Sequence, residues 1–288
     1  MIFLDLLKYD KKFLFGVLII SLSVFLAIST YFTNYDPTTV ESMLKDIPPG
    51  KEFILGTNSL GQDLFWRMSF AIKNSLTLGI LMGIFNILMG ATVGLLAGYF
   101  GGIIDRLLST LSDTFIVIPS LPVIIFISFL IKDHLNFPLL AFILALFSWP
   151  WVARQTRSLI LSLRERQFTF TSIFSGNNSI KVILTQHFPF IISFLIAHFI
   201  NSIQSAMSTE IVLSVFGLSR VDIPTIGTMI YWANQYQALL LGLWWWVLNP
   251  VIESIILFYS LYLTSVSISN YLDPRTRLLR IEVNIGKS

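Results

Sequence analysis

Residues 161–189, LSLRERQFTFTSIFSGNNSIKVILTQHFP, form a polar break between two apolar runs that are each long enough to cross a bilayer. The break carries charges at Arg164, Glu165, Arg166 and Lys181, yet hydrophobic residues recur in it at helical spacing. A solvated loop that merely obeys the positive-inside rule does not need that spacing. The stretch therefore predicts two short cytoplasmic helices with a Gly-Asn-Asn hinge, through which a soluble partner acts on a membrane protein.

The composition of the whole chain is typical of a membrane protein. Of its 288 residues, 55% are hydrophobic and 12% are charged, and the mean hydropathy is +0.76. A soluble domain carries about twice that share of charge. The chain has no cysteine, which excludes disulfides and thiolate metal sites. The net charge of +3 is small, and no basic stretch interleaved with aromatic residues indicates nucleic-acid binding.

Apolar runs of about 20 residues or more predict six transmembrane helices. They lie at residues 13–32, 75–99, 113–131, 138–161, 190–216 and 244–269. A signal peptide is the competing interpretation of the first run, but the length of the run favours a retained helix. Pro119, Pro122 and Pro150 fall inside the third and fourth runs and predict kinks. Residues 217–243 are expected to form a loop of mixed character.

The runs divide the chain into four segments. We expect an N-terminal segment with the first helix at 1–33, an extracytoplasmic loop at 34–73, a five-helix core at 74–270 and a cytoplasmic tail at 271–288. Glycines spaced four or seven apart in the second helix predict close packing against a neighbour. With the N-terminus inside, 13 of the 19 Lys and Arg residues fall on the inner side, which predicts that both termini and the polar break are cytoplasmic.

No arrangement of residues in the sequence indicates an enzyme. The final Gly286-Lys287-Ser288 resembles the end of a phosphate-binding loop, but Ile281 stands where that loop needs a glycine, and no helix follows. The chain is therefore not expected to hydrolyse ATP by itself. His134, His187 and His198 have no second ligand at metal-binding spacing. We predict no catalytic residue and no metal site.

Two carboxylates, Glu210 and Glu253, lie inside predicted spans. A charge in that position costs about 3 kcal/mol and needs a cavity or a partner. For Glu210, a role in a transport pathway and a role as a brace between helices are both open. Glu253 lies close to the Trp244-Trp245-Trp246 run that suits the membrane interface, so the brace is favoured there.

Five motifs, in order, resemble those of the inner-membrane permease subunits of ATP-binding-cassette importers, specifically the C-type subunit of the dipeptide, oligopeptide and nickel group. The motifs are GTNSLGQD from Gly56, LAGYFGG from Leu96 with Asp105, RER from Arg164, EIVLSVFG from Glu210 and LDPRTR from Leu272. The resemblance covers residues 56–277. The family motif positions are Gly56, Gly61, Asp63, Gly98, Gly101, Asp105, Gly217, Asp273, Pro274 and Arg275.

The resemblance implies an all-α integral membrane protein with six transmembrane helices and a cytoplasmic coupling helix between the fourth and the fifth. Such a protein forms half of a translocation pathway in a prokaryotic cell membrane and works by alternating access. Its implied partners are a second permease subunit, two ATPase subunits that bind ATP and Mg, an extracytoplasmic substrate-binding protein and membrane lipid. No cofactor is implied in this chain. The residues implied in ATPase coupling are Arg164, Glu165, Phe168, Ser172, Gly176, Ile180 and Pro189.

The coupling signature departs from the family pattern E-A-A-x-x-x-G. Phe170, Thr171 and Ser172 replace its Glu-Ala-Ala, whereas Gly176 remains and Pro189 follows. The coupling helix is therefore expected without its usual charge contact to the ATPase. A matched change in the ATPase, or a second permease with the standard signature, would compensate.

The substrate is less defined than the family. Gln62 stands where the group has arginine, and the loop after Gly217 lacks the group's run of prolines. Peptides are the first expectation, and oligosaccharides and nickel or other metal chelates are the alternatives. A stand-alone membrane scaffold or enzyme is the alternative from a different class of protein.

Overall fold

The computed structural model describes residues 6–8, 10–40 and 44–272, which are mostly helical and contain no strand. Five helical stretches in this part of the chain are long and apolar enough to cross a membrane. They are α2 (Lys11–Ser29), α3 (Leu64–Phe100), α6 (Phe137–Arg164), Ser179–Val215, which ends in α9 (Phe188–Val215), and α11 (Trp244–Leu272). The bent pair α4 (Gly102–Val117) and α5 (Ser120–Leu130) makes a sixth if it is one span. The predicted fold class, an all-α integral membrane protein, is confirmed.

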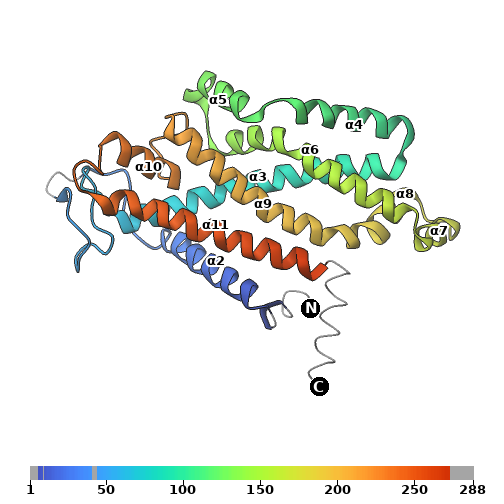
Figure 1. The fold of residues 1–288 in the computed structure, drawn as a ribbon, viewed down its shortest axis with the longest axis horizontal. Coiled ribbons are helices and arrows are strands. Elements are labelled where there is room, and N and C mark those ends of the chain that lie inside the picture. Colours follow the sequence, from blue (N-terminus) through green and yellow to red (C-terminus); the bar gives the residue numbers. More distant parts are fainter. Residues whose placement is uncertain (1–5, 9, 41–43, 273–288) are drawn as a thin grey trace.

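Helix α3 lies at the centre of the bundle. It packs along α6 and α9, while α11 packs against α2 and α9 (Figure 1). Helix α7 (Gln167–Phe174) lies at one end of the bundle, called here the α7 end. Helix α10 (Ile226–Gln235) lies at the opposite end, called here the α10 end.

The predicted small-residue packing of the second span is confirmed at the contact between α3 and α6. Gly90, Gly94 and Gly98 face α6 so closely that an added Cβ at Gly94 would lie 2.5 Å from the carbonyl oxygen of Ala153. At Gly98 the same atom would lie 2.8 Å from Cβ of Ile160. No side chain larger than hydrogen fits along this line, so the two helix backbones are in direct contact.

The third span differs from the single kinked helix expected at 113–131. The helical structure begins at Gly102 and breaks at Pro119, where α4 and α5 meet at 79°. Ile118, which precedes the proline, is extended with ψ 125°, because the proline ring disfavours helical backbone at the residue before it. A proline therefore divides this span instead of only kinking it.

Helix α3 begins at Leu64, inside the segment that was expected to be a loop. The side chain of Asp63 accepts a hydrogen bond from the backbone of Phe65 and so starts the helix. At 37 residues, α3 is about 55 Å long, well above the roughly 30 Å of a hydrocarbon core. Hydropathy marks only the part of a helix that lies in the membrane, and this helix extends beyond it.

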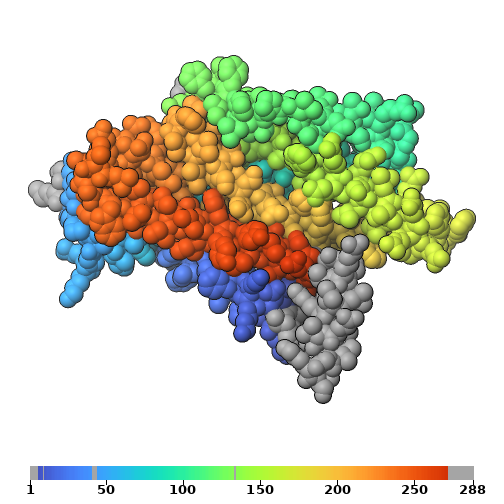
Figure 2. All heavy atoms as spheres, viewed as in Figure 1, coloured from blue at the N-terminus to red at the C-terminus, as the bar shows by residue number. Residues whose placement is uncertain are grey.

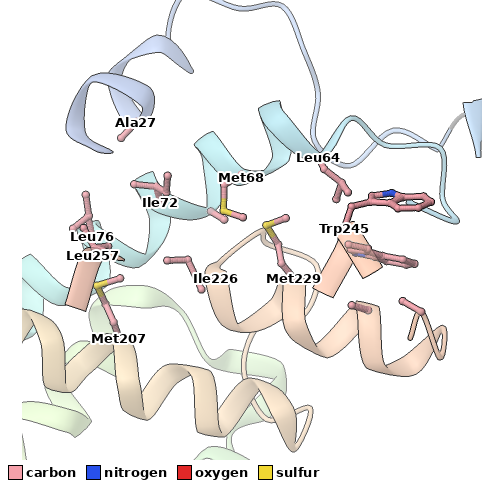
Figure 3. Close-up of a cluster of buried hydrophobic side chains, with 14 of the residues drawn as sticks. Ala27, Leu64, Met68, Ile72, Leu76, Met207, Ile226, Met229, Trp245 and Leu257 are labelled. Atoms are coloured by element: carbon pink, nitrogen blue, oxygen red, sulfur yellow. The ribbon is translucent and has the colours of Figure 1, made fainter. Parts of the chain in front are cut away.

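Helix α10 occupies a stretch that was expected to be a loop. Thr225 caps it, and Ile226, Met229 and Ala233 recur on one buried face. Ile226 and Met229 point toward Met68 of α3 within a hydrophobic cluster (Figure 3). That spacing was the available sequence signal, although ten residues are too few for a hydropathy window.

The polar break folds into two short helices, as predicted. Helix α6 ends at Arg164, and α7 is followed by a turn and then by α8 (Ser179–Val182). A π-helical turn, η3 (Ile183–His187), joins α8 to α9 without interruption. In the space-filling view, α7 and α8 project beyond the other described helices at their end of the bundle (Figure 2).

Candidate functional site

The base of α7 is anchored to both α6 and α9. Thr169 is fully buried, and its hydroxyl donates a hydrogen bond of 2.9 Å to the carbonyl oxygen of Leu163, at the end of α6. The Phe168 ring stacks on Phe190 of α9, with ring centroids 5.3 Å apart. Helix α7 is therefore attached to both spans that flank it.

Arg164 and Glu165, the first two implied coupling residues, lie at the end of α6, where Arg164 is the last helical residue and Glu165 follows it. Arg164 Nη1 donates a 3.1 Å hydrogen bond to the carbonyl oxygen of Tyr99, in the last turn of α3. Gly101, with φ +67°, ends α3 beside this guanidinium, and Glu165 caps α6 and is exposed. Arg164 thus ties the end of α3 to the end of α6.

The turn after α7 is open to solvent on one side and closed by hydrogen bonds on the other. Ser172 is buried, and its Oγ accepts a 3.0 Å hydrogen bond from Asn177 Nδ2. Gly176 has φ +81°, and an added Cβ would meet nothing within 4 Å. A left-handed backbone at an open position explains the glycine by conformation and not by crowding.

An apolar surface covers the outward face of α7 and α8. We call it the α7 surface, and it consists of Phe170, Ile173, Phe174 and Ile180. Phe174 is 88% exposed, Ile180 66% and Phe170 50%. Phe168 and Ser172, implied in coupling by the resemblance, lie inward, and Pro189 is exposed in the first turn of α9.

Phe170, Ile173 and Phe174 are not among the residues that the resemblance implies in ATPase coupling. Their i, i+3, i+4 spacing was the signal that places them on one face of a helix. An amphipathic helix normally turns its apolar face toward its own protein, whereas this one presents aromatic residues outward. An outward aromatic patch on a short, anchored helix suits insertion into a groove of a partner.

The GTNSLGQD motif forms a compact turn at the α10 end. Gly56 has φ +77°, and an added Cβ would lie 2.7 Å from the carbonyl oxygen of Ile47 and 2.9 Å from the Trp245 ring. Trp245 Nε1 donates a 3.1 Å hydrogen bond to Thr57 O. Gly61 also has a left-handed backbone, with φ +75°, and Asp63 caps α3. The motif therefore joins the start of α3 to the start of α11.

Two ion pairs join α4 to α6. Asp105 accepts two hydrogen bonds from Arg157, of 2.5 and 2.7 Å, and Arg154 pairs with Asp113. A cavity of about 330 Å³ lies between α3, α4 and α6, with Asp113 and both arginines in its lining. The Asp105 of the second family motif thus holds the first half of the broken span against α6.

Glu210 is fully buried and acts as a shared acceptor. Its Oε1 accepts hydrogen bonds from the hydroxyls of Ser214 at 2.6 Å, Ser219 at 3.0 Å and Thr225 at 2.7 Å. Thr225 is the residue that caps α10. Gly217, with φ +67°, ends the α9 region and turns the chain back toward this carboxylate. The geometry favours the brace among the two roles considered for Glu210.

Glu253 occupies a simpler environment. It is half-buried in α11, and its Oε1 accepts a 3.2 Å hydrogen bond from Ser23 Oγ of α2. Gly16 of α2 packs on α11 nearby, because an added Cβ there would lie 2.8 Å from Ser260 O. Glu253 thus helps to hold α2 against α11.

The loop between α9 and α10 contains one ion pair outside the spans. Arg220 donates hydrogen bonds of 2.8 and 2.6 Å to the two carboxylate oxygens of Asp222. Hydrogen bonding to this guanidinium holds the pKa of Asp222 below its ordinary value. The ion pair lies in the loop between Ser219 and Thr225, the two loop residues that donate hydrogen bonds to Glu210.

No group of three potential metal ligands occurs in residues 6–8, 10–40 and 44–272. His198 Nε2 lies 3.1 Å from Gln155 Oε1, and His187 lies beside Thr169. The family motif positions Asp273, Pro274 and Arg275 lie outside the described residues.

Known proteins match this chain over most of its length. A profile of the family described as "Binding-protein-dependent transport system inner membrane component" matches residues 90–278, which include α7. The chain is 31% identical over 249 residues to the oligopeptide transport system permease protein OppC of Mycobacterium tuberculosis, covering 86% of this chain and 84% of that protein. It is 29% identical over 265 residues to the nickel transport system permease protein NikC of Escherichia coli K12, covering 90% and 92%. It is 24% identical over 272 residues to the dipeptide transport system permease protein DppC of Bacillus subtilis, covering 94% and 84%.

Proposed function

This chain belongs to the family of binding-protein-dependent transport system inner membrane components, and from that premise we propose that its α7 surface is the contact for the ATPase subunits of an importer. The chain is a transmembrane permease subunit of an ATP-binding-cassette importer. The single observation that carries the proposal is the outward aromatic face of α7, with Phe174 88% exposed at the tip of the bundle. A short, anchored helix with an exposed apolar face can bind in a groove on the surface of a partner protein.

The contacts at the base of α7 support the mechanical part of the proposal. Thr169 attaches α7 to the end of α6, and Phe168 stacks on Phe190 of α9. A displacement of α7 by the ATPases therefore acts on both spans. The glycine contact of α3 with α6, and the ion pairs of α4 with α6, carry the displacement onward to the broken span. Alternating access is the resulting mode of transport.

The partners follow from the same proposal. The complete importer contains a second permease subunit, two ATPase subunits and an extracytoplasmic substrate-binding protein. ATP and Mg bind in the ATPase subunits, and this chain supplies no catalytic residue. The chain spans the membrane several times, and we place the α7 end and both termini in the cytoplasm. The surplus of Lys and Arg residues on that side supports this orientation.

Peptides are the proposed substrates, because OppC and DppC relatives are named for oligopeptide and dipeptide transport. Nickel complexes are the second candidate, because the NikC relative is named for nickel transport and covers 90% of this chain. Binding of peptides and of nickel chelates to the substrate-binding protein that co-purifies with the chain discriminates between the two.

The α7 surface is tested by purifying the chain from its native membrane in gentle detergent and identifying its companions by mass spectrometry. Phe174→Asp should reduce the recovery of ATPase subunits at least several-fold, because it places a charge in an apolar contact. Ile54→Asp is the matched control, since Ile54 is a similarly exposed apolar residue at the opposite end of the bundle. Equal recovery of ATPases with Phe174→Asp and with wild type would refute the contact. Recovery of wild-type chain alone, while a control importer stays assembled, would indicate a stand-alone membrane protein.

A further inference from the structure

His187 is buried at the point where the α7 region joins α9. It is the last residue of the π-helical turn η3, and no part of it is exposed. Its Nε2 lies 3.0 Å from Oγ1 of Thr169 in α7. The Tyr99 ring of α3 lies 5.6 Å from the imidazole, centroid to centroid. Residues from three helices thus meet around this side chain.

The direction of the hydrogen bonds follows from the Thr169 hydroxyl. This hydroxyl has one hydrogen, which it donates to Leu163 O at 2.9 Å. It must therefore accept from His187, so the imidazole carries its hydrogen on Nε2. The result is a directed chain from His187 through Thr169 to Leu163, which connects the start of α9, the coupling helix and the end of α6.

The other ring nitrogen of His187 has no hydrogen-bond partner among the described residues. Nδ1 is buried and, in this tautomer, is an acceptor. Buried polar atoms are usually satisfied, so an exception needs an explanation. The position of the ring therefore allows the hydrogen bond from Nε2 to Thr169 and leaves Nδ1 without one.

The backbone that carries His187 is irregular as well. A π-helical turn holds one residue more than an α-helical turn, and such turns inside helices often occur at functional sites. The hydrogen bond to Thr169 links this wide turn to α7, and the Phe168 ring of α7 lies 6.4 Å from the imidazole, centroid to centroid. Without the bond, α7 would still contact this region through aromatic rings, because Phe168 stacks on Phe190 and lies edge-on to His187.

We propose that His187 and Thr169 are positioning residues, whose hydrogen-bonded chain to Leu163 makes α7 move as one body with the end of α6 and the start of α9. The proposal rests on the coupling role given to α7 above. Neither residue touches the ATPase in this scheme, because both are buried. They act by transmitting the position of α7 to the two spans.

The test measures the distance between α7 and α9 in the assembled importer. The chain has no natural cysteine, so Thr171→Cys on α7 and Ile196→Cys on α9 can be spin-labelled specifically. Both side chains are exposed and lie outside the chain of hydrogen bonds. With its ATPases bound, the otherwise wild-type importer should give one narrow distance distribution, both without nucleotide and after trapping with ATP and vanadate.

Two matched pairs of variants decide the proposal. Thr169→Val and His187→Phe keep the shape but remove the hydrogen bond, and each should broaden the distribution after trapping. Thr169→Ser keeps the hydroxyl and His187→Gln keeps a hydrogen-bond donor, so each should retain the narrow distribution of the wild type. The double variant Thr169→Val/His187→Phe should give a distance distribution no broader than that of either single variant, because both substitutions break the same series of hydrogen bonds.

Two outcomes would overturn the proposal, and they differ from failure of the coupling role itself. If ATPases co-purify and Thr169→Val still gives the wild-type distribution after trapping, the hydrogen-bonded chain does not position α7. If the distance distribution of Thr169→Ser is as broad as that of Thr169→Val, the broadening would be an effect of general packing and not of the lost hydrogen bond. The coupling role alone fails if wild-type chain recovers no ATPase, which the purification shows before any label is attached.

Discussion

Glu210 shows how one buried carboxylate can organise the loop that leads from α9 to α10. Three hydroxyls converge on its Oε1, two of them from the loop that leads to α10. Without the carboxylate, the buried hydroxyls of Ser214 and Ser219 would lose the acceptor that Oε1 supplies, and Thr225 would keep only its longer contact of 3.2 Å to Thr228 Oγ1. The residue is therefore expected to matter for the position of α10, whatever passes through the pathway.

Substitution of Glu210 by leucine should destabilise the α10 end. Leaving buried donors unsatisfied costs about 1–3 kcal/mol, so Glu210→Leu should lower the thermal unfolding midpoint of the purified chain. It should also open the segment 216–225 to limited proteolysis. Glu253→Leu is the control, because Glu253 accepts one long hydrogen bond and is only half-buried. Equal effects of the two substitutions would contradict the bracing role.

Helix α3 owes its central position to small residues. Gly90, Gly94 and Gly98 bring it into backbone contact with α6, and Gly79 and Gly83 bring it close to α9. Apolar side chains gain little from leaving lipid, so close van der Waals contact is a main source of helix association in a membrane. A single added side chain in this line should therefore separate two helices.

Gly94→Leu should disrupt the α3–α6 contact. The first atom of the new side chain would already lie 2.5 Å from Ala153 O, which is backbone and cannot move alone. Overpacking of this kind costs about 1–3 kcal/mol, and more where backbone must shift. We expect a lower yield of folded protein and a lower unfolding midpoint in detergent. Thr92→Leu adds bulk to the same helix at an exposed position and should retain wild-type stability; destabilisation equal to that of Gly94→Leu would refute the explanation.

The whole bundle has an even number of crossings if the pair α4 and α5 is one span. Six crossings return the chain to the side from which it started. Helix α7 lies at one end of the bundle, and the leucine-rich turn before α11 lies at the α10 end (Figure 1). These two segments are therefore expected on opposite sides of the membrane.

Single-cysteine labelling checks this topology, because the chain has no cysteine of its own. Leu240→Cys, at a position 83% exposed, should react with a membrane-impermeant maleimide in spheroplasts. Ser175→Cys, in the turn after α7, should react only in inside-out vesicles. Labelling of Ser175→Cys in intact spheroplasts would place the α7 surface away from the ATPases and would contradict the proposed function.

Features that depend on neighbours along the chain could be predicted from the amino-acid sequence. Hydropathy over about 20 residues predicted the spans, because burial in lipid is decided by local composition. Glycine spacing predicted close packing of the second span, and helical spacing within a polar segment predicted two short helices at 161–189. The motifs gave the family. None of these inferences needs to know which helix lies beside which.

Contacts between residues that are far apart in the chain could be seen only in the folded protein. Trp245 contacts the turn at Thr57 although 188 positions separate them, and His187 reaches Thr169 because a π turn and α7 fold against one another. The outward direction of Phe174, and the inward direction of Ser172, depend on how α7 sits on α6 and α9. Such contacts are set by the packing of several helices at once, which no local spacing encodes, because the same sequence period fits any neighbour with a complementary surface.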